Sequence, residues 1–182
     1  WFELRCSISM IPRVYIRSPV EADWSVLLEL HQRSADYHFP WAEPAKNTQG
    51  CQRYIRRCQT EPLEGLLIWH AIDHRLVGVA NLSQIFYGRF QNAYLGYYGS
   101  VDYAGQGLMT EGVQLVLNHG FNSLNLHRIE ANIQPGNGAS INLVKRLGFA
   151  NEGLSQKYLK VNGEWRDHER WALTVENWRP AP

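Results

Sequence analysis

Short runs of alternating apolar and polar residues recur in the first half of the chain, and each predicts a β-strand. In residues 13–17, Val14 and Ile16 alternate with longer polar neighbours, so both side chains are expected to face the core. Two further apolar runs, residues 66–72 and 76–82, flank a three-residue polar turn. Their length and turn chemistry predict a hairpin.

Helical spacing follows the first of these strands. Ser18 in front of a proline, with Glu21 three residues later, predicts a helix that begins with a capping box. A stripe of side chains at helical spacing is expected to face the core: Trp24, Leu27, Leu28 and His31. A second helix is predicted over residues 48–59, with Cys51 and Cys58 on its buried face.

A glycine turn joins the aromatic strand predicted at residues 93–98 to a helix that begins near Met109. Gly105 and Gly107 allow a sharp turn with uncovered N–H groups, and the helix start adds unpaired N–H groups of its own. Such a place binds phosphate. No lysine follows Gly107, so the Walker pattern fails, and Thr110 stands where the dinucleotide fingerprint needs a third glycine.

The last third of the chain predicts a strand, a helix and a second hairpin. Residues 128–133 read as a strand, and Asn137 then caps a helix. Asn162 and Gly163 interrupt the β-rich stretch 158–174, which indicates a type I′ hairpin. Because three antiparallel strands precede the glycine turn, a doubly wound fold is not expected.

Composition sets limits on the class of protein. The 182 residues, 45% of them apolar and 19% charged, fit a single soluble domain over residues 1–182, with residues 1–10 as a possible N-terminal extension. A formal net charge of +1 predicts no direct nucleic-acid partner. The three cysteines have no metal-site or disulfide spacing, which predicts no metal and fits a reducing cytoplasm. Signal-peptide and membrane-spanning patterns are not found, so we expect a cytoplasmic protein without a membrane partner.

A second motif gives the glycine turn its context. Asn137-x-x-Ser140, followed by Leu147-Gly148-Phe149, comes after the Gly-Gln-Gly-Leu-Met turn. Together the two motifs resemble the Gcn5-related N-acetyltransferase (GNAT) family, in particular its ribosomal-protein alanine acetyltransferase branch (RimJ and RimL), with RimJ the nearer of the two. The likeness runs from about residue 13 to residue 178, and its further matches are residues 40–44, 78–81, 94–97, 127–129 and 162–168.

The phosphate loop departs from the general family pattern, Gln/Arg-x-x-Gly-x-Gly/Ala, at two of its three marked positions. Ala104, Gly107 and Met109 occupy them. The RimJ and RimL branch is expected to share the methionine. With Ala104 in place of Gln or Arg, a side-chain contact is lost but the main-chain N–H that holds the phosphate is kept.

The resemblance implies an α/β (α+β) GNAT fold, with a mixed, mostly antiparallel central sheet of about seven strands and about four flanking helices. It also implies acetyl-CoA as co-substrate. Amides of the glycine turn would hold the diphosphate, and the end of the aromatic strand would splay from its neighbour and bond the pantetheine arm. The cofactor-binding residues implied are Tyr98, Gly99, Val101, Ala104, Gly105, Gln106, Gly107, Leu108, Met109, Thr110, Asn137 and Ser140.

The chemistry needs a neutral amine and an acid for the leaving thiolate. Many relatives place a tyrosine acid where this chain has Val144, and Ser140 is the substitute we expect. Asn132 and Tyr158 are expected to act on the amine as a base or to hold water, with Glu152 and His168 as alternatives. Residues expected to bind the acceptor are Trp41, Asn81 and Tyr97. The loop around Trp41 has two interpretations, a rigid connector or a wall of the acceptor pocket.

The function implied is direct transfer of acetyl to the N-terminal α-amine of a protein, with a ribosomal protein that begins with alanine or serine as the expected partner. Such an amine has a pKa of about 7.7 to 8.0, so roughly a tenth of it is neutral at pH 7, and a weak base suffices. Two alternatives stay open. One is an acetyltransferase for a small amine such as an antibiotic or polyamine, and the other is a non-catalytic acyl-CoA-binding module.

Overall fold

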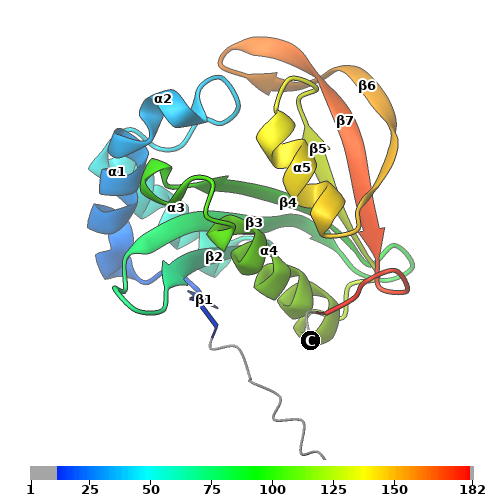
Figure 1. Ribbon diagram of the computed structural model, residues 1–182, viewed down its shortest axis with the longest axis horizontal. Coiled ribbons are helices and arrows are strands. Elements are labelled where there is room, and N and C mark those ends of the chain that lie inside the picture. The colour runs from blue at the N-terminus through cyan, green and yellow to red at the C-terminus, as the bar shows by residue number, and fades with distance from the viewer. Residues whose placement is uncertain (1–11, 181–182) are drawn as a thin grey trace, which may run out of the picture.

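A seven-stranded sheet in the order β1-β2-β3-β4-β5-β7-β6 runs through the computed structural model, which describes residues 12–180 (Figure 1). The strands are β1 (Val14–Arg17), β2 (Leu63–His70), β3 (Leu76–Phe86), β4 (Asn92–Gly99), β5 (Arg128–Ile133), β6 (Ala150–Val161) and β7 (Glu164–Thr174). The α-helices are α1 (Trp24–Arg33), α2 (Ala35–His38), α3 (Thr48–Thr60), α4 (Leu108–Asn118) and α5 (Gly138–Arg146). The predicted extension over residues 1–10 lies outside the described residues.

Every strand pairing is antiparallel except the one between β4 and β5, which is parallel. These two strands are joined through three residue pairs, the last of them Tyr94 with Glu130. Beyond that pair β4 continues to Gly99 along β3, so β4 and β5 separate. The mostly antiparallel seven-stranded sheet is therefore confirmed, with five α-helices among residues 12–180 where about four were expected.

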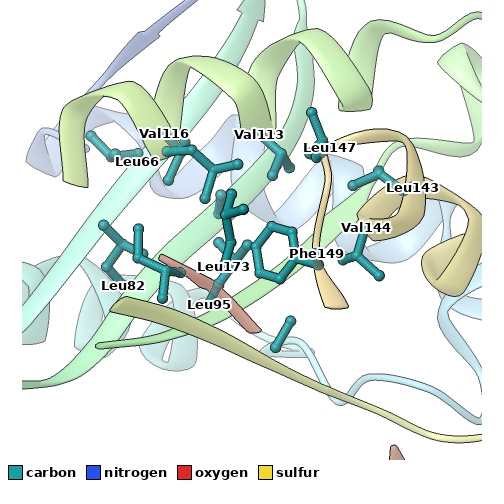
Figure 2. Close-up of a cluster of buried hydrophobic side chains, with 14 of the residues drawn as sticks. Leu66, Leu82, Leu95, Val113, Val116, Leu143, Val144, Leu147, Phe149 and Leu173 are labelled. Carbon is teal, nitrogen blue, oxygen red and sulfur yellow. The ribbon is translucent and has the colours of Figure 1, made fainter. Parts of the chain in front are cut away.

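Two apolar clusters cover the two faces of the sheet. Side chains of α4 and α5 pack on one face, where Figure 2 shows Val113 and Val116 of α4, Val144 of α5 and Phe149 gathered around the strand residue Leu95. On the other face, side chains of α1 and α3 pack against β2 and β3. Burial of these apolar side chains is the main term that holds the layers together.

The start of α1 differs from its prediction. Ser18 does not cap the helix, which is preceded by a 3₁₀ turn at Glu21–Asp23. The carboxylate that reaches back belongs to Asp23, and it accepts the N–H of Val20 at 2.7 Å. Arg17 holds the same carboxylate with two bonds of 2.7 and 2.8 Å, so an ion pair with the end of β1 decides the turn.

The other local predictions fare better. The stripe on α1 is confirmed for Leu27 and His31, which are buried, and α3 buries Cys51 with Cys58 partly covered. In the β6–β7 turn, Asn162 (φ 49°) and Gly163 (φ 79°) both have the positive φ that a type I′ turn needs. No helix among residues 12–180 has the length and apolar character that crossing a membrane would need.

Candidate functional site

The separation of β4 from β5 opens a cavity of about 510 Å³. Successive side chains of β4 point to opposite faces of the sheet. Tyr97 accordingly packs with the α4 and α5 cluster and Tyr98 with the α1 and α3 cluster, and both line the cavity. The cavity therefore reaches both faces of the sheet, and its two ends can hold different groups.

On the α4 face, the glycine turn leaves peptide N–H groups open. Gly105 has φ 74° and Gly107 has φ 79°, a region that favours glycine. Gly107 is the N-cap of α4, and the first intrahelical bond runs from the N–H of Glu111 to its carbonyl at 3.2 Å. The three amides between them therefore have no acceptor within the helix and are available to an anion.

Met109, one of the departures from the family pattern, has a structural cause. Its side chain lies over Gly78 and Gly99, which pair across β3 and β4. A Cβ built on Gly99 would stand 2.8 Å from Met109 Cγ, and one on Gly78 would come closer still to its sulfur. The glycine pair makes room for the methionine, which fixes the first turn of α4 against the sheet.

Two arginines lie beside the glycine turn. Arg13 donates to the carbonyl of Gln106 at 3.2 Å and forms an ion pair with Glu111, whose hydrogen bond raises the pKa of the arginine. Arg146 of α5 lies 3.4 Å from the hydroxyl of Thr110. Among the residues that the structure describes, Arg146 is the one Arg or Lys that lines the cavity.

Ser140 and Asn137 lie together at the start of α5. The side chain of Asn137 accepts the N–H of Ser140 at 3.2 Å, which caps the helix as predicted. The hydroxyls of Ser140 and Tyr97 are 2.6 Å apart. Burial raises the pKa of the Tyr97 phenol to about 12. Val144, at the family's tyrosine position, is buried in the core.

On the opposite face, the cavity wall holds amide and imidazole groups. Tyr54 donates to Asn81 Oδ1 at 2.7 Å, which leaves the Asn81 amide N–H groups for the cavity. His168 is buried, and its Nδ1 lies 2.9 Å from the carbonyl of Arg166. Because a carbonyl only accepts, Nδ1 of His168 carries a proton and donates it to this carbonyl. Asn132 Oδ1 is buried and has no partner among residues 12–180.

His38 is a second histidine at the wall. Its Nε2 donates to the carbonyl of Gly99 at 2.8 Å, its Nδ1 has no partner within the described residues, and burial lowers its pKa. The lowered pKa favours the neutral form of His38, whose unprotonated Nδ1 is buried. No Asp or Glu is found in the cavity wall as far as residues 12–180 define it. Nor do those residues contain a group of three or more His, Cys, Asp or Glu side chains suited to a metal.

Most residues predicted for the site line this one cavity. They are Trp41, Asn81, Tyr97, Tyr98, Gly99, Ala104, Gly105, Gly107, Met109, Thr110, Asn132, Asn137 and Ser140. Of the two interpretations of the loop around Trp41, this arrangement favours a cavity wall. Tyr97, predicted to bind the acceptor, instead faces the α5 side and bonds Ser140.

The remaining predictions fall outside the cavity lining. The N–H of Val101 donates to Ser34 Oγ at 3.1 Å, so it is not free for a pantetheine arm. The side chain of Leu108 is buried, although its amide belongs to the open first turn of α4. Gln106 and Tyr158 do not reach the lining either, and Tyr158 lies beside His168 with ring centroids 6.3 Å apart.

Glu152, an alternative base in the sequence, is also excluded by its surroundings. Its carboxylate pairs with Arg128, which lowers its pKa, and it does not line the cavity. Sequence reasoning missed Arg146 and His38. No spacing in the sequence places Arg146 beside Ser140, because side chains six residues apart on a helix point in different directions.

Comparison with known proteins gives this arrangement a context. Residues 13–150 match the model of the acetyltransferase (GNAT) domain. The [ribosomal protein uS5]-alanine N-acetyltransferase of Escherichia coli is 32% identical over 193 residues, with 95% of this chain and 97% of that protein covered. The probable N-acetyltransferase YjcK of Bacillus subtilis is 36% identical over 141 residues, with 78% and 76% covered.

Solved structures agree with these relatives. The structure of Mycobacterium smegmatis RimJ in complex with CoA-disulfide superimposes with a TM-score of 0.81 at 27% identity, and 90% of this chain and 82% of that chain are covered. A shorter stretch of 74 residues, 41% of this chain and 40% of the relative, is 31% identical to spermidine N(1)-acetyltransferase of Escherichia coli.

Proposed function

This chain belongs to the acetyltransferase (GNAT) family as an acetyl-CoA-dependent N-acetyltransferase, and from that premise we propose that it acetylates the N-terminal α-amine of a protein. The acceptor we propose is a ribosomal-protein terminus that begins with alanine or serine; the relative in Escherichia coli is named for ribosomal protein uS5 and alanine. We also propose that residues 1–182 form one acetyltransferase domain, since the described part shares one sheet.

The α4 end of the cavity fits the phosphates of acetyl-CoA. Open amides of the first turn of α4 and the guanidinium of Arg146 suit an anion, and the separated edge of β4 offers backbone groups to an extended pantetheine arm. Asn137 and Ser140 would then flank the thioester, because both line the same cavity at the start of α5. The thioester supplies an activated acetyl group, and these residues hold and orient it.

The acceptor would enter from the α1 face. There the amide of Asn81, the imidazole of His168 and the ring of Trp41 line the wall. An α-amine that is partly neutral at pH 7 needs only a weak proton acceptor, which a neutral imidazole can provide. We propose that His168 or a water held by Asn132 takes the amine proton, and that Ser140 protonates the leaving sulfur.

A polyamine is the second candidate, favoured by the short match to a spermidine acetyltransferase. A polyamine carries several positive charges and is best held by carboxylates. The cavity wall carries no Asp or Glu among the described residues, and this single observation supports a peptide terminus over a polyamine. In a non-catalytic module, the open amides and Ser140 would bind acyl-CoA but would not take part in a reaction.

A competition of acceptors tests the proposal. Purified protein is incubated with acetyl-CoA and, in separate reactions, with peptides that begin with alanine or serine, the same peptides blocked at the N-terminus but containing lysine, and spermidine. We expect CoA release with the free-terminus peptides, with mass spectrometry placing the acetyl group on the first residue.

The controls separate the alternatives. Faster turnover of spermidine than of any peptide would show that the protein is a polyamine acetyltransferase. Binding of CoA in calorimetry without turnover of any amine would favour the non-catalytic module. Acetylation of the blocked peptides at lysine would contradict the preference for a terminal amine.

A further inference from the structure

We propose that Tyr97 supplies the proton that Ser140 delivers to the leaving thiolate, so that a strand tyrosine replaces the helix tyrosine absent from this chain. The inference rests on the proposed function, because it concerns the same transfer reaction. It adds a second hydroxyl, from β4, to the acid side of the site. Tyr97 acts through Ser140 and is in that sense a positioning residue.

The geometry comes from the face of the sheet that Tyr97 occupies. Its ring packs with the core cluster on the α4 and α5 side, and its hydroxyl lies 2.6 Å from Ser140 Oγ and 3.2 Å from the Ser140 carbonyl oxygen. Both residues line the cavity. When the phenol donates to Oγ, the shorter contact, the proton of Ser140 is free to point into the cavity toward the sulfur.

Val144, at the position where many relatives have a tyrosine, cannot donate a proton. Val144 is fully buried, and Figure 2 shows it among the apolar side chains around Phe149. A hydroxyl at this position would be enclosed in the core. A phenol reaches the start of α5 from β4 instead, since the hydroxyl of Tyr97 is hydrogen-bonded to Ser140 Oγ.

Relative acidities explain why a serine needs this partner. A thiol has a pKa of about 8.5 and a free phenol one of about 10, whereas an aliphatic hydroxyl is a far weaker acid than either. The phenol of Tyr97, with its pKa raised to about 12 by burial, is still the better acid of the pair. Ser140 alone would have to form an alkoxide, but a simultaneous transfer from Tyr97 avoids that species.

Proton transfer accompanies the cleavage of the thioester. When the carbon–sulfur bond breaks, its electron pair goes to the sulfur, which takes the proton of Ser140 Oγ. Ser140 Oγ takes the phenol proton of Tyr97 in the same event. The tyrosinate then takes a proton from water, and the group that accepted the amine proton returns it to the hydroxide that is left, so the net reaction yields an amide and a thiol.

A double-mutant cycle tests the proposal. Tyr97→Phe keeps the ring and removes only the hydroxyl, so we expect kcat to fall about 10- to 100-fold while the KM for acetyl-CoA stays within about twofold. Ser140→Ala should cause a similar or larger fall. If both groups serve one proton path, the double variant should be no slower than Ser140→Ala. Losses that multiply would overturn the proposal, as would an unchanged kcat in Tyr97→Phe.

A second readout separates proton transfer from mere support of Ser140. We expect the single-turnover rate of the unsubstituted protein, plotted against the deuterium fraction of the solvent, to follow a curved line. Curvature of this kind is expected when two protons move in the rate-limiting step. The curve should become a straight line in Tyr97→Phe. A straight line in the unsubstituted protein would contradict the relay.

Tyr94→Phe is the matched control, since Tyr94 lies on the same strand but does not line the cavity. This variant should keep the parent kcat, and thermal unfolding checks that all variants are folded. The outcomes also separate the two proposals. If the unsubstituted protein acetylates no amine, the proposed function fails; if it is active and the cycle is additive, only the role of Tyr97 fails.

Discussion

The stability of this protein should fall steeply between pH 7 and pH 5, because His31 is held neutral in the folded state. Its Nδ1 donates to the carbonyl of Ala45 at 2.8 Å, and its Nε2 accepts the hydroxyl of Tyr98 at 3.0 Å. Burial is the main cause that lowers its pKa from 6.5 to about 4, and the charge of His38 adds to it. Protonation would also oblige the Tyr98 hydroxyl to turn its proton away.

The sign follows from proton binding. Below pH 6.5 the unfolded chain takes up a proton at His31 that the folded chain refuses, so acid favours the unfolded state. The contribution is complete above about pH 6.5 and is lost as the pH falls to about 4. Between pH 7 and pH 5 the loss is about 2 kcal/mol, and the full loss is about 3 kcal/mol.

Urea unfolding followed by circular dichroism at a series of pH values measures this effect. The comparison variant is His31→Gln, which keeps polar atoms but cannot titrate. It should be less stable at pH 7 and should lose about 2 kcal/mol less than the parent between pH 7 and pH 5. The buried His38, whose pKa is also lowered, keeps some pH dependence in the variant. If both proteins lose the same free energy, His31 is not the source.

Two further predictions concern the binding of coenzyme A, measured by calorimetry. Gly107→Ala strains a residue with φ 79° and misaligns the open amides, so the Kd should rise at least about tenfold. Gly88→Ala, at φ 72° and outside the cavity lining, imposes similar strain and should leave the Kd unchanged. Arg146→Gln should weaken binding about 5- to 20-fold, an effect that shrinks for a phosphate-free pantetheine thioester. Lys145→Gln, which makes the same charge change beside Trp171, should bind as the parent does, and equal losses in both variants would refute a specific contact.

Local signals in the sequence were sufficient where the conformation depends on neighbours along the chain. Gly107 and Met109 marked the start of α4, and Asn162 with Gly163 marked a hairpin turn, because positive φ and open N–H groups are local requirements. The start of α1 was misplaced because Arg17, held by β1, selects the carboxylate of Asp23.

Elements with little burial were also hard to predict. The strand β6 begins at Ala150, eight residues before the predicted stretch. Its first residues are exposed on both faces, so no alternation of apolar and polar residues marks them. Pairing with β7 alone makes this segment a strand.

The sequence predicted which residues form the site better than it predicted the contacts among them. Most predicted residues meet at the cavity because the two motifs lie on α4 and α5, which border the same gap. The bond between Tyr97 and Ser140 depends on how β4 is placed against α5, which no spacing in the sequence reveals. The occupied N–H of Val101 depends in the same way on Ser34 of a distant helix end.

The short seam between β4 and β5 has a mechanical consequence. Only one end of these two strands is hydrogen-bonded, so we expect β1 to β4 and β5 to β7 to move relative to each other about Tyr94 and Glu130. A pantetheine arm bound in the gap would hold the two groups of strands in a fixed arrangement. We expect the amide protons of β4 that point into the gap to exchange rapidly with solvent in the free protein and slowly once coenzyme is bound. The sheet of this enzyme would then become rigid only when its co-substrate is bound.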